Sequence, residues 1–203
     1  MGQTFNSEKA LELICTRRST RTFADRQITD KELEEVLQAG RHAPSGGNNQ
    51  STHILVIRDK AVLAELAEKA EQEFAKMEIM PDTYKSMADS IRRSKAGGYI
   101  FHYNAPVLIL TANKESYSNN IADCACVLEN MMIMANALDL GSVWINQIKW
   151  LRDNDVILGI LRRIGLEDDE RVYGGLALGY SGLSSGLPVR EALKRTGNKV
   201  TYI

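Results

Sequence analysis

The 203-residue chain predicts an α+β fold, in which helices flank a central mixed or antiparallel sheet. Two observations carry this prediction. Short aliphatic runs, such as His53–Ile57 and Pro106–Thr111, are typical of buried strands. Longer amphipathic segments lie between them and begin at capping residues. No repeat, low-complexity segment or composition break divides the chain, so we expect one domain over residues 1–203.

The first predicted elements rest on local capping signals. Thr29 and Glu32 form a capping box, in which each side chain satisfies the backbone of the other residue. Asp59 supplies the cap of the next helix, directly after the first aliphatic run. In chain order, helices are predicted over residues 7–16, 30–41, 60–77, 119–140 and 154–164, and strands over 53–57, 106–111, 142–146, 171–180 and 198–203.

The later elements follow from apolar patterning and glycine stops. The predicted helix 119–140 is apolar on nearly every side, as a central core helix is, and Gly141 ends it. Asp153 and Gly165 bound the helix after the third strand, and the fourth strand is rich in glycine. Residues 198–203 alternate as a strand does. A final strand has to pair at the edge of its own sheet or on another subunit.

Residues 78–104 are the least decipherable part of the chain. They combine Pro81, a basic cluster from Arg92 to Lys95, and the pair Gly97-Gly98. We interpret them as a partly helical excursion over the surface. Such a segment is either a lid-like insertion with a function or a solvated charged helix without one.

Composition excludes several classes of function. A net charge of -1 and a hydrophobic fraction of 44% argue against a nucleic-acid-binding or disordered protein. No charged-then-apolar leader is visible and the longest apolar stretch is interrupted by polar residues, so we expect a cytoplasmic protein without a membrane span. The odd number of cysteines predicts buried free thiols and neither a disulfide framework nor a metal site. The three histidines, His42, His53 and His102, are scattered, and we expect helix-end or packing roles for them.

Two segments carry the chemistry. Residues 17–23 (Arg-Arg-Ser-Thr-Arg-Thr-Phe) place three guanidinium groups and two hydroxyls within five residues, and the guanidinium fork matches phosphate oxygens. Residues 43–50 (Ala-Pro-Ser-Gly-Gly-Asn-Asn-Gln) form a loop of small and amide side chains that can lie against a polar ring. Together they indicate a phosphorylated cofactor that carries a ring.

In five segments at matching spacing, the chain resembles the nitroreductase superfamily. The segments are residues 17–23, the loop 43–50, the core helix and strand at 128–145, the late strand 176–180, and the basic tail. The resemblance implies an interwound homodimer with exchange of the C-terminal strand and one FMN at each of two interface sites. It also implies an FMN-dependent NAD(P)H oxidoreductase with ping-pong kinetics, acting on nitroaromatics, quinones or related acceptors. No GxGxxG motif follows a strand, so a separate nucleotide-binding unit is not indicated.

The resemblance also implies which residues bind the flavin. Arg17 and Ser19 would face the phosphate and ribityl chain, and Arg21 the pyrimidine edge, where a fixed cation stabilises the charge of the reduced ring. The loop would contact the flavin of the other subunit, and the basic tail would bind phosphate, with Arg190 as a less certain addition. The full implied set is Arg17, Arg18, Ser19, Arg21, Pro44, Ser45, Gly46, Asn48, Asn146, Gln147, Lys194 and Arg195.

Three features leave alternatives open. Ser51 stands where proline usually follows the loop, and Asn146-Gln147 stand where Glu-Gly is frequent, although a backbone amide there could still approach flavin N5. Asp123 either approaches the site or is a satisfied buried carboxylate. The alternatives to a general reductase are a specialised dehydrogenase, dehalogenase or flavin-cleaving enzyme, and a protein that stores or senses FMN.

Overall fold

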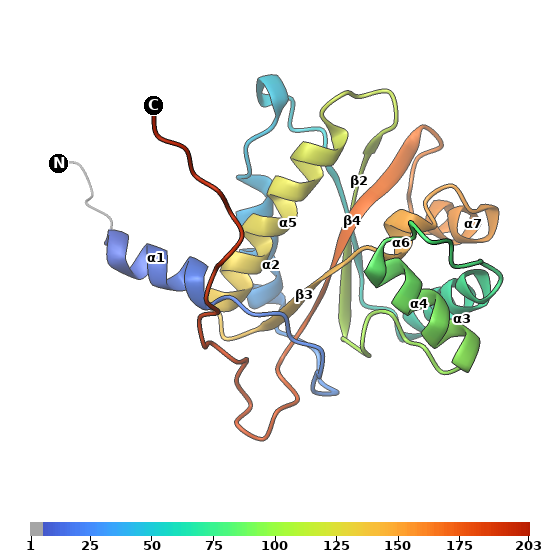
Figure 1. Cartoon of the computed structure of the whole chain (residues 1–203), viewed down its shortest axis with the longest axis horizontal. Helices are drawn as coiled ribbons and strands as arrows, with labels where there is room; N and C mark the ends of the chain where they lie inside the picture. Colours follow the sequence, from blue (N-terminus) through green and yellow to red (C-terminus); the bar gives the residue numbers. More distant parts are fainter. Residues whose placement is uncertain (1–5) are drawn as a thin grey trace.

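In a computed structural model, which describes residues 6–203, one antiparallel sheet lies between two layers of helices (Figure 1). The strands are β1 (His53–Ile57), β2 (Val107–Lys114), β3 (Gly141–Ile145) and β4 (Glu170–Gly179), in the order β1-β2-β4-β3. The helices are α1 (Ser7–Thr16), α2 (Asp30–Arg41), α3 (Lys60–Ala75), α4 (Lys85–Ala96), α5 (Asn120–Ala137), α6 (Gln147–Trp150) and α7 (Asp155–Arg163), with a 3₁₀ turn at Gly46–Asn48.

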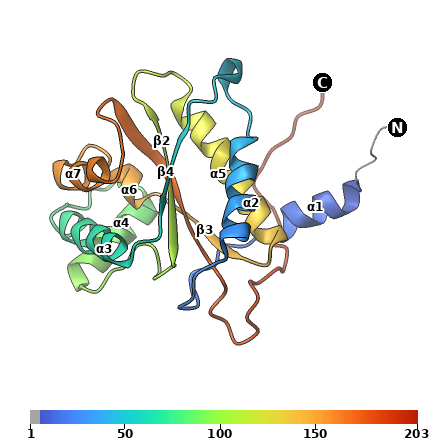
Figure 2. The same ribbon diagram turned by 180° about the vertical axis from the view of Figure 1, so that it is seen from behind.

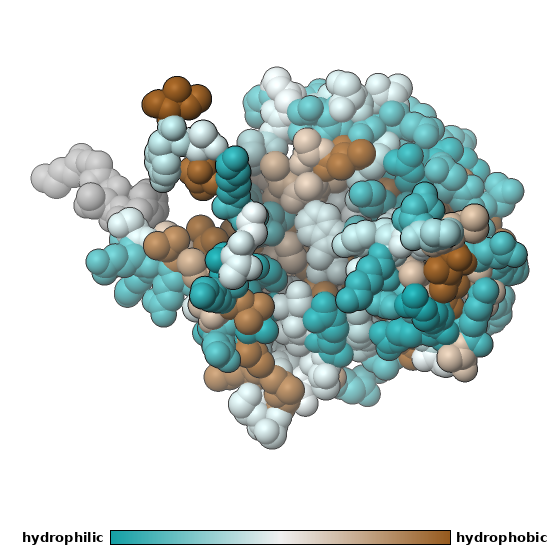
Figure 3. All heavy atoms as spheres, viewed as in Figure 1, coloured by the Kyte–Doolittle hydropathy of each residue, from teal (hydrophilic) through white to brown (hydrophobic). Residues whose placement is uncertain are grey.

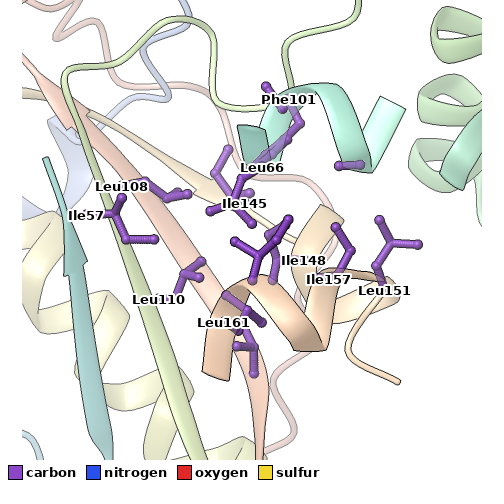
Figure 4. Close-up of a cluster of buried hydrophobic side chains, with 14 of the residues drawn as sticks. Ile57, Leu66, Phe101, Leu108, Leu110, Ile145, Ile148, Leu151, Ile157 and Leu161 are labelled. Carbon is purple, nitrogen blue, oxygen red and sulfur yellow. The ribbon is translucent and has the colours of Figure 1, made fainter. Parts of the chain in front are cut away.

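Both faces of the sheet are buried. Successive side chains of a strand point to opposite faces, so each strand can contribute to the apolar cluster on either side. On β2, Leu108 and Leu110 face one apolar cluster, whereas Val107 and Ile109 face the other. The first cluster is closed by α3, α4, α6 and α7, of which Figure 4 labels side chains from α3, α6 and α7, and the second by α2 and α5 (Figure 2). The α+β prediction is confirmed, and all named strand pairs are antiparallel.

Local capping signals gave accurate helix starts in two cases. The reciprocal hydrogen bonds of the Thr29–Glu32 capping box are present, and the Asp59 carboxylate accepts the amides of Ala61 and Val62. The start of α7 was predicted one residue early, because Asn154 and not Asp153 caps it. Strand β2 extends three residues beyond the prediction, and α5 ends three residues before it.

The C-terminal prediction was wrong for the single chain. Residues 198–203 form no strand within the described structure, and the tail from residue 183 onwards is mostly exposed. The tail is attached through Arg190, which contacts the backbone oxygen of Asn136 and pairs with Asp139 at 2.5 Å, at the end of α5. Strand exchange with another subunit stays a prediction.

The excursion at residues 78–104 is packed onto the body of the protein. Its helix α4 buries a face that contains Ala88, Ser90, Ile91 and Ser94, and it lies against α3 and α6 (Figure 1). Two of these four residues are serines, so this contact is unusually polar for a helix packed into a core.

The thiols are less uniformly buried than predicted. Cys124 is buried, Cys126 is half-buried and Cys15 is exposed. Burial raises the pKa of the Cys124 thiol to about 12. Within residues 6–203, no cluster of three metal-ligating side chains occurs and no helix has the length and hydropathy to cross a membrane.

Candidate functional site

The arginine segment lies along the free side of β3, at the sheet edge. The Thr20 backbone amide donates to the Ser142 backbone oxygen at 2.9 Å, and Ser19 and Ser142 form a parallel bridge. Further along, the Ala24 amide donates to the Tyr180 oxygen at 3.0 Å. These bonds hold the backbone from residue 19 to residue 24 against β3 and the end of β4, while the Ser19 side chain remains exposed.

The cations of this segment have no acidic partner. Within residues 6–203, no ion pair involves Arg17, Arg18 or Arg21, and none involves Lys194 or Arg195 of the tail. By contrast, most other arginines of the chain pair with a carboxylate. Uncompensated guanidinium groups in one place are the chemistry of an anion site.

The structure brings the tail to the arginine segment. The Arg18 guanidinium donates to the backbone oxygen of Glu191 at 2.8 Å. Lys194 and Arg195 follow three and four residues later and are exposed. Arg190, the less certain member of the predicted set, has its guanidinium engaged at the end of α5.

The loop 43–50 is held in a tight, partly left-handed conformation. Gly47, Asn48 and Gln50 have φ values of 59°, 57° and 52°. The Ser45 hydroxyl accepts the Gln50 amide at 2.9 Å, which closes the loop. Glycine and asparagine tolerate this region best, which explains why these residue types are concentrated here.

Asp123 anchors the loop to the first turn of α5. Its buried carboxylate accepts the Gly46 amide at 3.1 Å, the Tyr117 hydroxyl at 2.9 Å and the Asn119 amide at 3.3 Å. Asp123 is therefore a satisfied buried carboxylate. A Cβ added at Gly46 would lie 2.5 Å from Asn119 Nδ2 and 2.8 Å from the Tyr117 hydroxyl, so a larger residue there would displace the two side chains that share Asp123 with it. Sequence reasoning missed Tyr117 and Asn119, since no local pattern connects them to a loop about 70 residues away.

The two predicted halves of the flavin site lie at opposite ends of α5 (Figure 1). The loop is tied to the first turn through Asp123. The segment before Arg17 is tied to the last turn, where Asn136 Nδ2 donates to the Leu13 oxygen at 2.8 Å. An 18-residue helix is about 27 Å long. One chain therefore does not bring both halves to the same ligand.

The side chains of Asn146 and Gln147 are engaged within the protein. Asn146 Oδ1 accepts the Trp144 indole N–H at 2.8 Å. Gln147 is buried, with its amide nitrogen 2.8 Å from the Tyr99 hydroxyl. The Asn146 backbone amide is engaged as well, by the Gln147 side-chain oxygen at 3.2 Å, which leaves the rest of this turn's backbone for a ligand.

The histidines occupy helix-end and packing positions. His42 ends α2, where its Nδ1 lies 2.8 Å from the Gln38 oxygen, and His53 Nδ1 lies 2.7 Å from a Glu170 carboxylate oxygen. His102 is buried beside a cavity of about 690 Å³ between α3 and residues 98–106. Burial lowers the pKa of His102, so its imidazole is neutral at pH 7.

The α1 and tail surface is apolar. Leu11 and Ile14 of α1 are 62% and 52% exposed, and α1 has no buried residue. Leu187, Leu193 and Val200 of the tail are exposed too. Figure 3 shows hydrophobic surface gathered over both segments. Several exposed apolar side chains on two such segments are typical of a surface that contacts a partner.

Comparisons with known proteins place the chain in a family. The model of the Nitroreductase family matches residues 14–180. The crystal structure of a nitroreductase with bound FMN from Bacteroides fragilis NCTC 9343 is 31% identical, with a TM-score of 0.82, over 96% of this chain and 98% of that one. A protein of Archaeoglobus fulgidus, named provisionally as an NADH dehydrogenase/NAD(P)H nitroreductase, is 30% identical over 174 residues, 85% of this chain and 86% of its own.

A more distant relative is the nitrobenzene nitroreductase of Ectopseudomonas oleovorans, which is 24% identical over 199 residues, 84% of this chain and 86% of its own. The family match extends from the last turns of α1 to the end of β4, and it therefore includes the arginine segment, the loop and the α6 turn. The predicted nitroreductase-like fold is confirmed by the structural likeness. The chain belongs to the nitroreductase family.

Proposed function

We propose that this protein is an FMN-dependent oxidoreductase that takes hydride from NADH or NADPH and reduces nitroaromatic, quinone or related acceptors. One observation carries the proposal. Arg17 and Arg21 flank the exposed Ser19 in the sequence, and neither arginine has an acidic partner within the described residues. The relative from Bacteroides fragilis, which matches nearly the whole chain, holds FMN.

The donor set fits an FMN phosphate and ring. Arg17, Ser19 and the tail residues Lys194 and Arg195 would hold the phosphate and ribityl chain, because guanidinium, ammonium and hydroxyl groups are its usual donors. Arg21 would stabilise charge on the ring as a fixed cation. Bound FMN supplies the hydride chemistry, and the protein supplies position, electrostatics and access.

We propose that the working unit is a homodimer. The loop residues Pro44, Ser45, Gly46 and Asn48 lie at the far end of α5 from the arginine segment, so they would contact the flavin held by the partner subunit. The exposed apolar faces of α1 and the tail supply a surface for that partner, and the tail strand would form on it.

The kinetic proposal is a ping-pong sequence in the cytoplasm. The chain has no GxGxxG motif for a separate dinucleotide site, so hydride donor and acceptor would use one opening in turn. The acceptors are small molecules, and the proposal includes no metal, membrane or nucleic-acid partner. Initial rates at several fixed donor concentrations should give parallel double-reciprocal lines.

The cofactor test is an absorbance spectrum of the purified protein, followed by anaerobic titration with NADH and with NADPH. We expect a flavin spectrum that bleaches with at least one nicotinamide, and oxidation of that nicotinamide when menadione or nitrofurazone is present. A yellow protein that neither nicotinamide reduces would contradict the proposal and favour FMN storage or sensing. A flavin that is reduced but passes electrons to neither acceptor would favour a specialised substrate.

A variant pair tests the role of Arg21. Arg21→Ala should weaken FMN binding about tenfold or make the flavin midpoint potential more negative, because a cation beside the ring is lost. Arg41→Ala is the control, since Arg41 is an exposed arginine paired with Glu34 at 3.1 Å. Unchanged affinity and potential in Arg21→Ala would refute the assignment.

Assembly is tested by sedimentation velocity at micromolar concentration. We expect a dimer that carries flavin. A monomer that carries flavin would contradict the shared site.

A further inference from the structure

The turn between β3 and α6 is held from inside the protein by one side chain. The Gln147 side-chain oxygen accepts the backbone amide of Asn146 at 3.2 Å. Its nitrogen lies 2.8 Å from the Tyr99 hydroxyl and 3.2 Å from the Ser90 hydroxyl. Both partners belong to the excursion at residues 78–104, for which the sequence left open a lid-like function or a solvated helix without one.

The hydrogen atoms of this cluster can be assigned without conflict. The Gln147 amide nitrogen donates towards both the Tyr99 and the Ser90 hydroxyls, which lie on the same side of it. The Ser90 hydroxyl donates its proton to the backbone oxygen of Ser86 at 3.1 Å. Since that proton is used, the Tyr99 hydroxyl is the donor in its 3.0 Å bond with the Ser90 hydroxyl. A flipped Gln147 amide would set its NH₂ against the Asn146 N–H, so only one orientation satisfies every group.

The three side chains of the cluster are buried, and contacts with α3 and Arg93 hold the far end of the cluster in place. Gln147, Tyr99 and Ser90 are 8%, 4% and 2% exposed. The Tyr99 amide donates to the Glu71 carboxylate of α3 at 2.6 Å, and the Arg93 guanidinium lies 4.7 Å from the Tyr99 ring centre. In a low-dielectric interior, a fully satisfied network of this kind rigidifies the backbone that it holds.

We propose that Gln147 is a positioning residue, through which Tyr99 and Ser90 of the excursion hold the 146–147 backbone in the orientation that meets the flavin. This inference rests on the proposed function for the cofactor, and on the geometry above for the coupling. The excursion then affects the reaction indirectly, because it holds the turn at residues 146–147 in place. Loss of one buried hydroxyl in it should loosen the turn and lower the stabilisation of the reduced flavin.

The chain offers a matched control for the test. Ser94 lies one helical turn from Ser90 on the same buried face of α4, and its hydroxyl has no hydrogen-bond partner within the described residues. Ser94→Ala therefore removes a buried hydroxyl without touching the cluster. Tyr99→Phe removes only the hydroxyl that Gln147 binds, and Gln147→Met keeps the length of the side chain.

The first measurement is hydrogen–deuterium exchange on the full-length protein as purified. We expect the amides of residues 146–148 to exchange about tenfold faster in Tyr99→Phe and Gln147→Met, and at the parental rate in Ser94→Ala. The second is the flavin midpoint potential, which should become more negative in the first two variants and stay unchanged in the control.

The two proposals fail in different ways. A protein that does not take up FMN refutes the proposed function, whereas the exchange experiment still tests the coupling. Exchange in Tyr99→Phe and Gln147→Met that matches Ser94→Ala overturns the positioning role. Faster exchange with an unchanged potential overturns its link to the cofactor.

Discussion

The anchor of the 43–50 loop provides the sharpest test of how the fold builds the site. Asp123 is 3% exposed, and its carboxylate accepts the Gly46 amide at 3.1 Å. A hydrogen bond to a charged group contributes about 1.5–3 kcal/mol, and one between neutral groups about 0.5–1.5 kcal/mol. Asp123→Asn keeps an acceptor for the Gly46 amide and should lower the free energy of unfolding by about 1 kcal/mol. Asp123→Ala leaves that amide unpaired and should cost about 2–3 kcal/mol.

The assay is urea unfolding at fixed protein concentration, since association also contributes to the apparent stability of an oligomer. A control is needed for the charge at the helix start, because an acidic group there also interacts with the helix dipole. Asp155 lies in the first turn of α7 and is exposed, so Asp155→Asn should change the stability by less than about 0.5 kcal/mol. If Asp123→Ala is as stable as Asp155→Asn, the carboxylate does not anchor the loop and the reasoning is refuted.

Three further predictions concern the core, pH dependence and thiols. Phe74 is fully buried, and its ring packs edge-on against the Trp150 ring with 6.3 Å between the ring centres. Phe74→Ala should therefore lower the free energy of unfolding in urea by about 3–5 kcal/mol. A loss below about 1.5 kcal/mol would contradict this packing. Burial lowers the native pKa of His102, so the unfolded state binds more protons below about pH 6.5 and the stability falls there by up to about 1.4 kcal/mol per pH unit. His102→Gln should abolish that part of the slope, and an identical slope in both proteins would refute it. With its pKa at about 12, Cys124 should resist a thiol reagent at pH 8 while exposed Cys15 reacts, as peptide mass spectrometry would show; equal labelling would contradict this.

The features that the sequence predicted well depend on residues close together in the chain. The Thr29–Glu32 capping box and the aliphatic run that forms β2 each need only a few neighbouring positions. The start of α7 could not be predicted from neighbouring residues alone. Asp153 and Asn154 are both good caps, but the Asp153 carboxylate accepts the Arg171 guanidinium at 2.9 Å, which leaves the cap to Asn154. That choice depends on a contact 18 residues away.

The candidate site was predictable in its residue types and only partly in its supports. Arginines, small residues and amides in a compact pattern indicate ligand chemistry directly. The groups that hold them do not carry such a signal, because the Gly46–Asp123 and Tyr99–Gln147 bonds connect residues 77 and 48 positions apart. The tail illustrates a different limit, since alternation along a terminal segment does not reveal which strand it would pair with.

The placement of the two predicted cofactor-binding segments at opposite ends of α5 has a consequence for genetic complementation. In a dimer whose sites each combine the arginine segment of one subunit with the loop of the other, Arg21→Ala and Gly46→Val damage different halves. A mixed dimer of the two variants collects both lesions in one site and leaves the other site with two intact halves. Two alleles that are each impaired would therefore complement when co-expressed and restore about one intact site per mixed dimer.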